Sequence, residues 1–281
     1  MKYSLSIIIS HYCTNKNQNP LFKTLSTIEN QILNHNIEVI IADDGSNYSK
    51  TIMEKYSQKT TIPNDHRSFY KLENDCLNSF LNKNGIKNNL IKKWIYLPKT
   101  IQCMSKARVA NEAARIAESQ QLLFLDDDNY LISSNSITNI LDLFNDYHFI
   151  IGQVQDKNGK LRDYSSNRVQ GTTIGIKTSI FNKIEGFGTW TEKYSCGVDS
   201  DFWIKIFNYA QNNKPFKACY TNLIMTCDSY SKRWKKYTKF LKEIRLKYKF
   251  YTLYKCKNYK SAKHNPSRNK QRWIKNLIVD E

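Results

Sequence analysis

The chain has no long hydrophobic run. Nowhere in its 281 residues do about 18 apolar residues follow one another, so no membrane-spanning helix is expected. It also contains no internal repeat and no low-complexity linker. The apolar stretch at residues 4–9 is followed at once by His11 and a polar run, and it is too short for the core of a signal peptide. We expect it to form a first buried strand.

Paired cysteines are missing as well. The seven cysteines are scattered singly, no two of them form a Cys-x-x-Cys pair, and their number is odd. This pattern favours reduced thiols in the cytosol over a disulfide framework or a zinc site. We therefore expect a cytoplasmic protein, either free or peripheral at the inner face of the membrane.

Apolar residues are abundant enough to form a core. Hydrophobic residues make up 40% of the chain, including 18 tyrosines and 13 phenylalanines, which argues against a disordered protein. Positive charge, in contrast, is concentrated at one end. The net charge is +18, and residues 231–281 hold 17 lysines and arginines against three acids, a local net charge of +14.

The spacing of the hydrophobic residues predicts two strand–helix–strand units. β-Branched runs at residues 4–9 and 37–42 flank a helical repeat of apolar residues between Leu21 and Ile32. The second unit is a strand at 94–97, an alanine-striped helix between residues 103 and 117, and a strand at 121–125. This alternation predicts an α/β domain with a largely parallel sheet.

The remaining segments are less regular. Residues 48–93 are rich in Asn, Lys and Ser and show no clear period, so we expect a helix plus a long polar insertion there. Later elements are expected as a helix over 136–144, a strand over 149–154, a strand over 171–176 and a helix over 199–210.

Acidic residues stand at three places close to predicted strand ends or in a later turn. Asp43-Asp44 follow the strand at 37–42, Asp126-Asp127-Asp128 follow the strand at 121–125, and Asp199 and Asp201 open an aromatic helix. A lone acidic turn is usually a helix cap or a solvated loop. Three such sets in one α/β domain are more informative, because ligands bind outside the carboxyl ends of the strands. Carboxylates there suit Mg²⁺ or Mn²⁺ together with phosphate oxygens.

Several motifs occur in a fixed order between residues 4 and 210. They are Ser6-Ile7-Ile8-Ile9-Ser10-His11-Tyr12, Glu38 to Ser46 with its Asp-Asp-Gly-Ser turn, Ala107 to Asn111, Leu123 to Asp128, Gly186-Phe187-Gly188 and Gly197 to Trp203. In this order and spacing they resemble the motifs of family 2 glycosyltransferases. The resemblance implies the GT-A fold, a Rossmann-like, mostly parallel sheet flanked by helices, and inverting transfer from a nucleotide diphosphate sugar, here a UDP-sugar.

The resemblance also assigns the donor side of the site. It implies that Asp44 contacts the base or ribose of the nucleotide, with Ser10 and Tyr12 lining the same place. It further implies that Asp126 and Asp128 form a metal-binding pair for Mn²⁺ or Mg²⁺, with Asp128 as the direct ligand.

Three further residues are expected to contact substrate, but an ordinary structural role would also explain each of them. Arg108 would approach the diphosphate, although a salt bridge on a helix surface would explain it equally well. Asp127 could bind substrate or be a solvent-facing neighbour of the metal pair, and Asp201 could bind substrate or cap a helix. Asp43 could be a turn former.

Asp199 matches the position of the family's catalytic base, which would take the proton of the acceptor hydroxyl. The sequence departs from the family pattern in two respects. Val198 stands where many relatives have Glu, which leaves the choice between Asp199 and Asp201 open. The segment from 219 to 234 has no histidine as a further metal ligand, and Asp228 is the acid that could replace it.

The basic tail is predicted to contain an amphipathic helix. Its large apolar residues recur every three or four positions: Trp234, Tyr237, Leu241, Ile244, Tyr248 and Tyr251. Such a helix could bind an anionic membrane surface, grip an acidic glycan acceptor, or cover the catalytic domain with its aromatic face. Beyond His264-Asn265-Pro266 we expect the chain to loosen.

These observations favour one division of the chain and one activity. Residues 1–230 would form the GT-A catalytic domain, with a nucleotide-sugar half at 1–128 and an acceptor half at 129–230, followed by the basic helical tail at 231–281. The acceptor would be a surface polysaccharide or a lipid-linked glycan. The alternative is a nucleic-acid-binding protein that uses the basic tail, but it leaves the acids at the strand ends unexplained. A nucleotidyltransferase is disfavoured because no glycine-rich phosphate loop follows the first strand.

Overall fold

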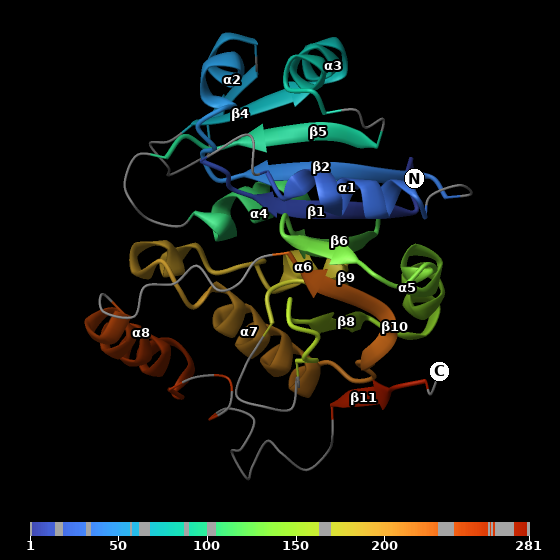
Figure 1. Cartoon of the computed structure of the whole chain (residues 1–281). Coiled ribbons are helices and arrows are strands. Elements are labelled where there is room, and N and C mark those ends of the chain that lie inside the picture. The colour runs from blue at the N-terminus through green and yellow to red at the C-terminus, as the bar shows by residue number, and fades with distance from the viewer. Residues whose placement is uncertain are drawn as a thin grey trace.

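The structure is a computed structural model. It describes residues 2–14, 19–31, 35–56, 58–61, 68–86, 90–99, 105–162, 170–229, 239–257, 259, 261 and 273–279. An 11-stranded sheet runs through the molecule, and helices cover both of its faces (Figure 1). The predicted α/β fold with a mostly parallel central sheet flanked by helices is confirmed. Among the helices of the described residues, none is long and apolar enough to cross a membrane.

The elements alternate between strands and helices along most of the chain. The strands are β1 (Leu5–His11), β2 (Ile37–Asp43), β3 (Gln58–Thr61), β4 (Ser68–Glu73), β5 (Ile91–Tyr96), β6 (Gln121–Asp126), β7 (Asn129–Leu131), β8 (Phe149–Gln155), β9 (Ile174–Lys177), β10 (Ala218–Asp228) and β11 (Ile274–Leu277). The helices are α1 (Leu21–Glu29), α2 (Lys50–Tyr56), α3 (Asn74–Lys83), α4 (Lys106–Arg115), α5 (Ser136–Asp146), α6 (Thr178–Lys183), the 3₁₀ helix η2 (Thr189–Tyr194), α7 (Val198–Asn212) and α8 (Lys239–Tyr254).

The strand order places a topological switch beside β1. The sheet runs β11-β10-β8-β9-β6-β1-β2-β5-β4-β3, with β7 paired to β10. β1 is parallel to both β2 and β6, and β2 is parallel to β5. After β2 the chain passes to the edge strand β3, returns through β4 to β5, and then crosses to β6 on the other side of β1. In open α/β sheets, ligands bind outside the carboxyl ends of the strands at such a point.

The two faces of the sheet are buried against different sets of helices. Successive side chains of a strand point to opposite faces. Ile8 accordingly belongs to the apolar cluster that includes residues of α4, α6 and α7, whereas Ile7 and Ile9 belong to the cluster under α1, α3 and α5. Burial on both faces explains why β1 and β2 read as near-continuous apolar runs.

The segment at residues 48–93 contains more regular structure than its sequence predicts. Besides a helix, α2, it holds the antiparallel pair β3 and β4, a second helix, α3, and the start of β5. The helix α3 buries Leu77, Phe80 and Leu81 at three- and four-residue spacing. Polar residues on its exposed side hide this stripe in the sequence, so the expectation of a long polar insertion was wrong for the described part of this segment.

The basic tail contributes a helix and a strand that pack on the rest of the chain. β11 pairs in parallel with β10 and so extends the central sheet. α8 packs through Leu246, Phe250 and Tyr254, whereas Ile244 and the two tyrosines 248 and 251 are exposed. The side chains of Trp234, Tyr237 and Leu241 lie outside the described residues. The predicted amphipathic helix is thus present as α8. Of its predicted apolar face, the three described members are exposed, and Leu246, Phe250 and Tyr254 cover the domain in their place.

We predict that the two faces of α8 differ sharply in their contribution to stability. Phe250 is 2% exposed and its ring lies 5.2 Å from that of Trp190, so Phe250→Ala should lower the free energy of unfolding by about 3–5 kcal/mol. Tyr248 is 72% exposed, and Tyr248→Ala should change the free energy of unfolding by less than about 0.5 kcal/mol. Urea unfolding of both variants measures the difference. Equal unfolding midpoints would show that α8 is not packed as described.

Candidate active site

The acidic sets predicted from the sequence meet at the carboxyl ends of β1, β2 and β6. Ser10 near the end of β1 lies between Ala42 of β2 and Asp126 of β6 in the strand register. Asp44 follows β2 directly, and its amide donates to the carbonyl oxygen of His11 at 2.9 Å. Asp44 and the acidic triplet therefore flank β1 at the switch point of the sheet.

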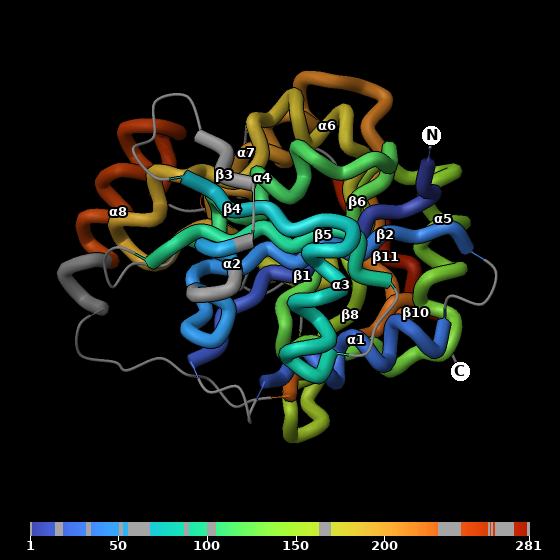
Figure 2. Tube along the Cα trace, turned by 90° about the horizontal axis from the view of Figure 1, so that it is seen from above, coloured from blue at the N-terminus to red at the C-terminus, as the bar shows by residue number. Residues whose placement is uncertain are grey.

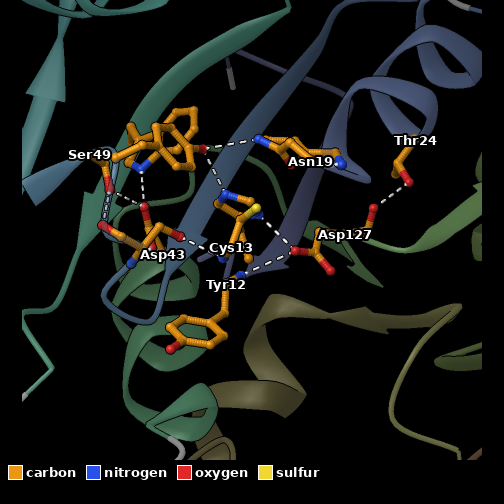
Figure 3. A network of polar contacts seen from close by, with 12 residues as sticks. Tyr12, Cys13, Asn19, Thr24, Asp43, Ser49 and Asp127 are labelled. Atoms are coloured by element: carbon orange, nitrogen blue, oxygen red, sulfur yellow. Dashed lines mark hydrogen bonds and ion pairs between the residues drawn. The ribbon is translucent and has the colours of Figure 1, made fainter. Parts of the chain in front are cut away.

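Asp43 stabilises the turn that follows β2. It is fully buried, and its carboxylate accepts hydrogen bonds from the Ser46 amide at 2.8 Å, the Ser49 hydroxyl at 2.8 Å and the Trp94 indole at 3.1 Å (Figure 3). All of its interactions are thus with the turn and β5. This is the turn-forming role that the sequence allowed for it.

Asp44 is buried but incompletely paired. Its Oδ2 accepts the Ser105 amide at 2.9 Å and lies 3.6 Å from the Lys99 ammonium, while its Oδ1 is buried without a hydrogen-bond partner. Burial raises the pKa of Asp44 to about 6, against the opposing effects of Lys99 and the Ser105 amide. A buried carboxylate oxygen without a partner is costly for the fold, so a ligand that donates to it would gain binding energy.

Tyr12 and Asp44 both lie beside the ammonium group of Lys99. The Lys99 ammonium sits 3.6 Å from the centre of the Tyr12 ring, within cation–π range, as well as beside Asp44. The backbone amide of Tyr12 donates to Asp127 Oδ2 at 3.1 Å. Tyr12 and Asp44 are therefore brought together as predicted, with Lys99 between them.

Asp127 points into the protein. It is 6% exposed, and its Oδ2 accepts His11 Nδ1 at 2.7 Å, while its carbonyl oxygen accepts the Thr24 hydroxyl at 2.8 Å (Figure 3). Because the carboxylate only accepts, His11 donates through Nδ1, and its Nε2 then accepts the Tyr48 hydroxyl at 2.7 Å. Burial raises the pKa of Tyr48 and keeps that hydroxyl protonated.

This arrangement corrects the solvent-facing interpretation of Asp127. Its contacts are with β1, α1 and the residues that follow β1, so it anchors the middle of the acidic triplet while Asp126 and Asp128 stay less buried on either side. Its side-chain Oδ2 is engaged by His11 and by the amide of Tyr12.

Lys106 supplies the positive charge at the centre of the acidic residues. It is the first residue of α4, and its Nζ donates to Asp126 Oδ1 at 2.5 Å and to the Gly171 carbonyl at 3.3 Å. The carboxylates of Asp126, Asp199 and Asp128 raise the pKa of Lys106 more than burial lowers it. The pKa of Asp126 is itself raised by burial, against the opposing effect of Lys106. One ammonium thus lies among three carboxylates and offsets part of their negative charge.

Asp199 belongs to this charged group because of its position against Gly171. A methyl group on residue 171 would overlap the Asp199 carboxylate, so only glycine leaves room for that carboxylate here. Lys106 contacts the same glycine through its carbonyl oxygen. The first turn of α7 therefore brings Asp199 to the group formed by Lys106 and the acidic triplet.

Asp201, one half-turn further along α7, has a different environment. It is fully buried and accepts hydrogen bonds from Trp190 Nε1 at 2.9 Å and from the Tyr254 hydroxyl of α8, and Lys205 lies 3.5 Å away. These contacts tie α7 to η2 and α8. Of the two acids that the sequence left open as the base, Asp199 is the half-buried one, and Asp201 is held inside the protein.

Arg108 forms a salt bridge within the protein. Its Nε donates to the buried Glu192 of η2, whose other carboxylate oxygen accepts the Ser105 hydroxyl. The charge of Glu192 also acts on Asp44, so this pair lies near the nucleotide side. The salt-bridge interpretation describes Arg108 in this structure, with Glu192 as a partner that no motif predicted.

Asp228 is not placed as a replacement for a metal-ligating histidine. It ends β10 beside the acidic triplet, since Ser229 donates its amide to the Asp128 carbonyl at 2.7 Å. Its carboxylate, however, pairs with the Arg162 guanidinium and accepts the Asn129 side-chain amide. In this structure the carboxylate of Asp228 is therefore engaged by Arg162 and Asn129.

The residues present fit a divalent cation bound together with a nucleoside diphosphate. Within the described residues, no group of three or more His, Cys, Asp or Glu side chains is arranged to hold a metal ion. Mg²⁺ in nucleotide sites, however, uses only one or two carboxylates besides phosphate oxygens and water. Asp126 and Asp128 offer such hard oxygen donors, and Lys106 beside them shows that this place stabilises positive charge.

Comparisons with known proteins were made at the level of sequence and of structure. No family model and no curated protein matches the chain. Among solved structures, TarS 1-349 from S. aureus matches with a TM-score of 0.49 and 14% identity over 81% of this chain and 58% of that one. TarS 1-349 in complex with UDP-GlcNAc matches with a TM-score of 0.49 and 13% identity over 84% and 61%.

A third solved structure is mannosyltransferase PcManGT from Pyrobaculum calidifontis in complex with GDP-Man and Mn²⁺. It matches with a TM-score of 0.49 and 14% identity, over 83% of this chain and 59% of that one. The chain therefore spans about three fifths of the length of these three solved chains.

The residues that the sequence did not single out are mostly partners of those that it did. Lys106 carried a usable signal, because a cation at the first position of a helix is unfavourable unless nearby anions compensate it. His11 lies within the motif at residues 6–12. Its partner Asp127 is 116 residues further along the chain, so no local pattern indicates the pairing. Lys99 and Glu192 had no distinguishing pattern.

We predict that Asp44 makes stability depend on pH. Its pKa in the folded state is about 6 against an ordinary value of 3.8, so the stability it contributes is fully present below pH 4 and is lost as pH rises through 6. Asp44→Asn should therefore stabilise the protein above pH 7 by about 3 kcal/mol and much less at pH 4. Thermal unfolding across this pH range measures the gap in stability between the variant and the parent chain. Asp142→Asn, at an exposed position, is the control. A gap that is constant with pH would contradict the raised pKa.

Proposed function

We propose that this chain is an inverting GT-A glycosyltransferase that moves a sugar from a nucleotide diphosphate sugar, a UDP-sugar, to a glycan or lipid-linked acceptor. The observation that carries the proposal is the group formed around Lys106. Acids from two separate elements, Asp126 and Asp128 after β6 and Asp199 on α7, act on one ammonium at the switch point of a parallel sheet. A donor-side acid, Asp44, lies across the end of β1.

The donor nucleotide would bind on the β1–β2 side. The unpaired Oδ1 of Asp44 is an acceptor for an N–H of the base or a hydroxyl of the ribose. The Tyr12 ring, held by Lys99, offers an aromatic face beside it, and Ser10 lies at the strand end between the two sides. A diphosphate extending from there toward Asp126 would meet the ammonium of Lys106.

Asp128 and Asp126 would hold Mg²⁺ or Mn²⁺ together with the diphosphate. Asp126 pairs with Lys106, and the resemblance to family 2 glycosyltransferases favours Asp128 as the direct ligand. When bound, such an ion would stabilise the negative charge that develops on the departing nucleoside diphosphate. Lys106 would add a second positive charge on the same side.

Asp199 would act as the general base for the acceptor. Its carboxylate would take the proton of the acceptor hydroxyl as that oxygen bonds to the anomeric carbon, while the bond from this carbon to the phosphate oxygen breaks. A single displacement of this kind inverts the anomeric carbon. Gly171 leaves the space that this carboxylate occupies, and its charge acts on the Lys106 ammonium.

The first test concerns the metal. Asp128→Asn should abolish the thermal stabilisation that a UDP-sugar gives in the presence of Mn²⁺, because the variant loses an anionic oxygen ligand. The melting temperature without ligand should stay close to that of the parent chain, since Asp128 is only partly buried. Asp142→Asn, an exposed acid on α5, is the matched control and should keep the stabilisation. A fully stabilised and active Asp128→Asn enzyme would refute the metal assignment.

The second test separates the base from donor binding. Asp199→Asn should reduce kcat for sugar transfer by about 10²–10⁴-fold, yet leave Mn²⁺-dependent stabilisation by the donor within a few degrees of the parent value. Transfer to an acceptor supplied with radiolabelled donor measures kcat. Loss of donor binding together with activity would show that Asp199 belongs to the donor side instead.

A further inference from the structure

Helix α8 exposes an unusual concentration of large apolar side chains. In the described part of the chain, nine large hydrophobic residues are exposed, and α8 contributes four of them. They are Ile244 at 49%, Tyr248 at 72%, Tyr251 at 54% and Leu253 at 44%. The helix lies at the periphery of the molecule in both views (Figures 1 and 2).

Ile244, Tyr248 and Tyr251 form one stripe along the helix. They are spaced by four and three residues, which places them on a common face. We call these three residues the outer stripe. The opposite face packs through Leu246, Phe250 and Tyr254, and Tyr254 donates to Asp201. The outer stripe is therefore not needed to hold α8 on the protein.

Basic residues border the outer stripe on both sides. Arg245 and Lys247 are exposed and, at 100° per residue, fall on either side of it. The only acid in α8, Glu243, is partly buried. Exposed lysines 255 and 257 follow the helix, and the segment from 231 to 281 has a net charge of +14. An apolar stripe flanked by cations is thus presented by the most basic part of the chain.

We propose that the outer stripe of α8 docks the protein on an anionic lipid bilayer. Tyr and Ile side chains would enter the boundary between headgroups and acyl chains, while Arg245 and Lys247 contact lipid phosphates. A soluble polyanion, such as an acidic glycan or a nucleic acid, would satisfy the cations but leave the side chain of Ile244 in water. The lipid surface alone matches both the charge and the apolar side chains.

The position of α8 gives this docking a direction. Leu246 packs beside Gly197, two residues before Asp199, and Phe250 packs on Trp190 of η2. On the proposed function, on which this step alone rests, docking would bring the acceptor side of the site toward the membrane. A lipid-linked acceptor would then arrive next to the residues that use it.

Sedimentation of the full chain with lipid vesicles tests the apolar part. The parent chain should co-sediment with vesicles that contain phosphatidylserine and much less with phosphatidylcholine alone. Tyr248→Ser combined with Tyr251→Ser should weaken binding about tenfold or more, with an unchanged melting temperature. Leu161→Ser removes an exposed apolar side chain elsewhere and should bind as the parent does. Equal binding of the stripe variant and the parent would overturn the proposal.

Charge removal tests the electrostatic part. Arg245→Gln with Lys247→Gln should weaken vesicle binding about 30-fold, whereas Lys183→Gln with Lys217→Gln, exposed lysines away from α8, should have a small effect. If both double variants lost vesicle binding equally, the effect would depend on net charge alone. That result would overturn the proposal that the face of α8 carrying Arg245 and Lys247 contacts the bilayer. A parent chain that ignores vesicles but binds heparin or DNA through Arg245 and Lys247 would identify a polyanion site instead. Stabilisation by the nucleotide-sugar donor is measured in a separate experiment. The vesicle-binding results therefore test membrane docking independently of the proposed function.

Discussion

The arrangement of the site depends on the balance of charge around Lys106. Carboxylates from β6 and α7 come close together, and like charges at this distance would repel one another without a cation. The ammonium at the start of α4 supplies it, with the Gly171 carbonyl as a further acceptor. Because α4 follows β5 and α7 follows η2, this network of ion pairs connects two parts of the chain that are far apart in sequence.

The core explains why that network has a fixed place. The strand ends that carry Ser10, Asp44 and Asp126 are set by the parallel register of β1 with β2 and β6, and that register is held by apolar side chains on both faces of the sheet. Asp127 adds a polar lock, since its contact with His11 fixes the turn after β6 to the end of β1. Rigid strands and one buried polar contact thus position the buried Asp44 and the partly exposed Ser10 and Asp126.

The sequence predicted the parts of the fold that depend on local pattern. Apolar runs bounded by polar residues located β1, β2 and β6, and the acids after them were found because parallel strands end at one edge. Contacts between distant residues, such as Asp127 with His11 or Arg108 with Glu192, have no local signal. In α8 the sequence offers two apolar stripes with the same helical spacing, and only the neighbouring Trp190 and Gly197 decide which one packs.

Gly171 has a consequence for how this site can vary. The residue has no side chain and no chemistry of its own, yet the Asp199 carboxylate occupies the volume that any side chain at 171 would fill. A side chain at position 171 would displace the Asp199 carboxylate from the group around Lys106. The empty space beside the carboxylate is therefore as much a part of this arrangement as the acid itself.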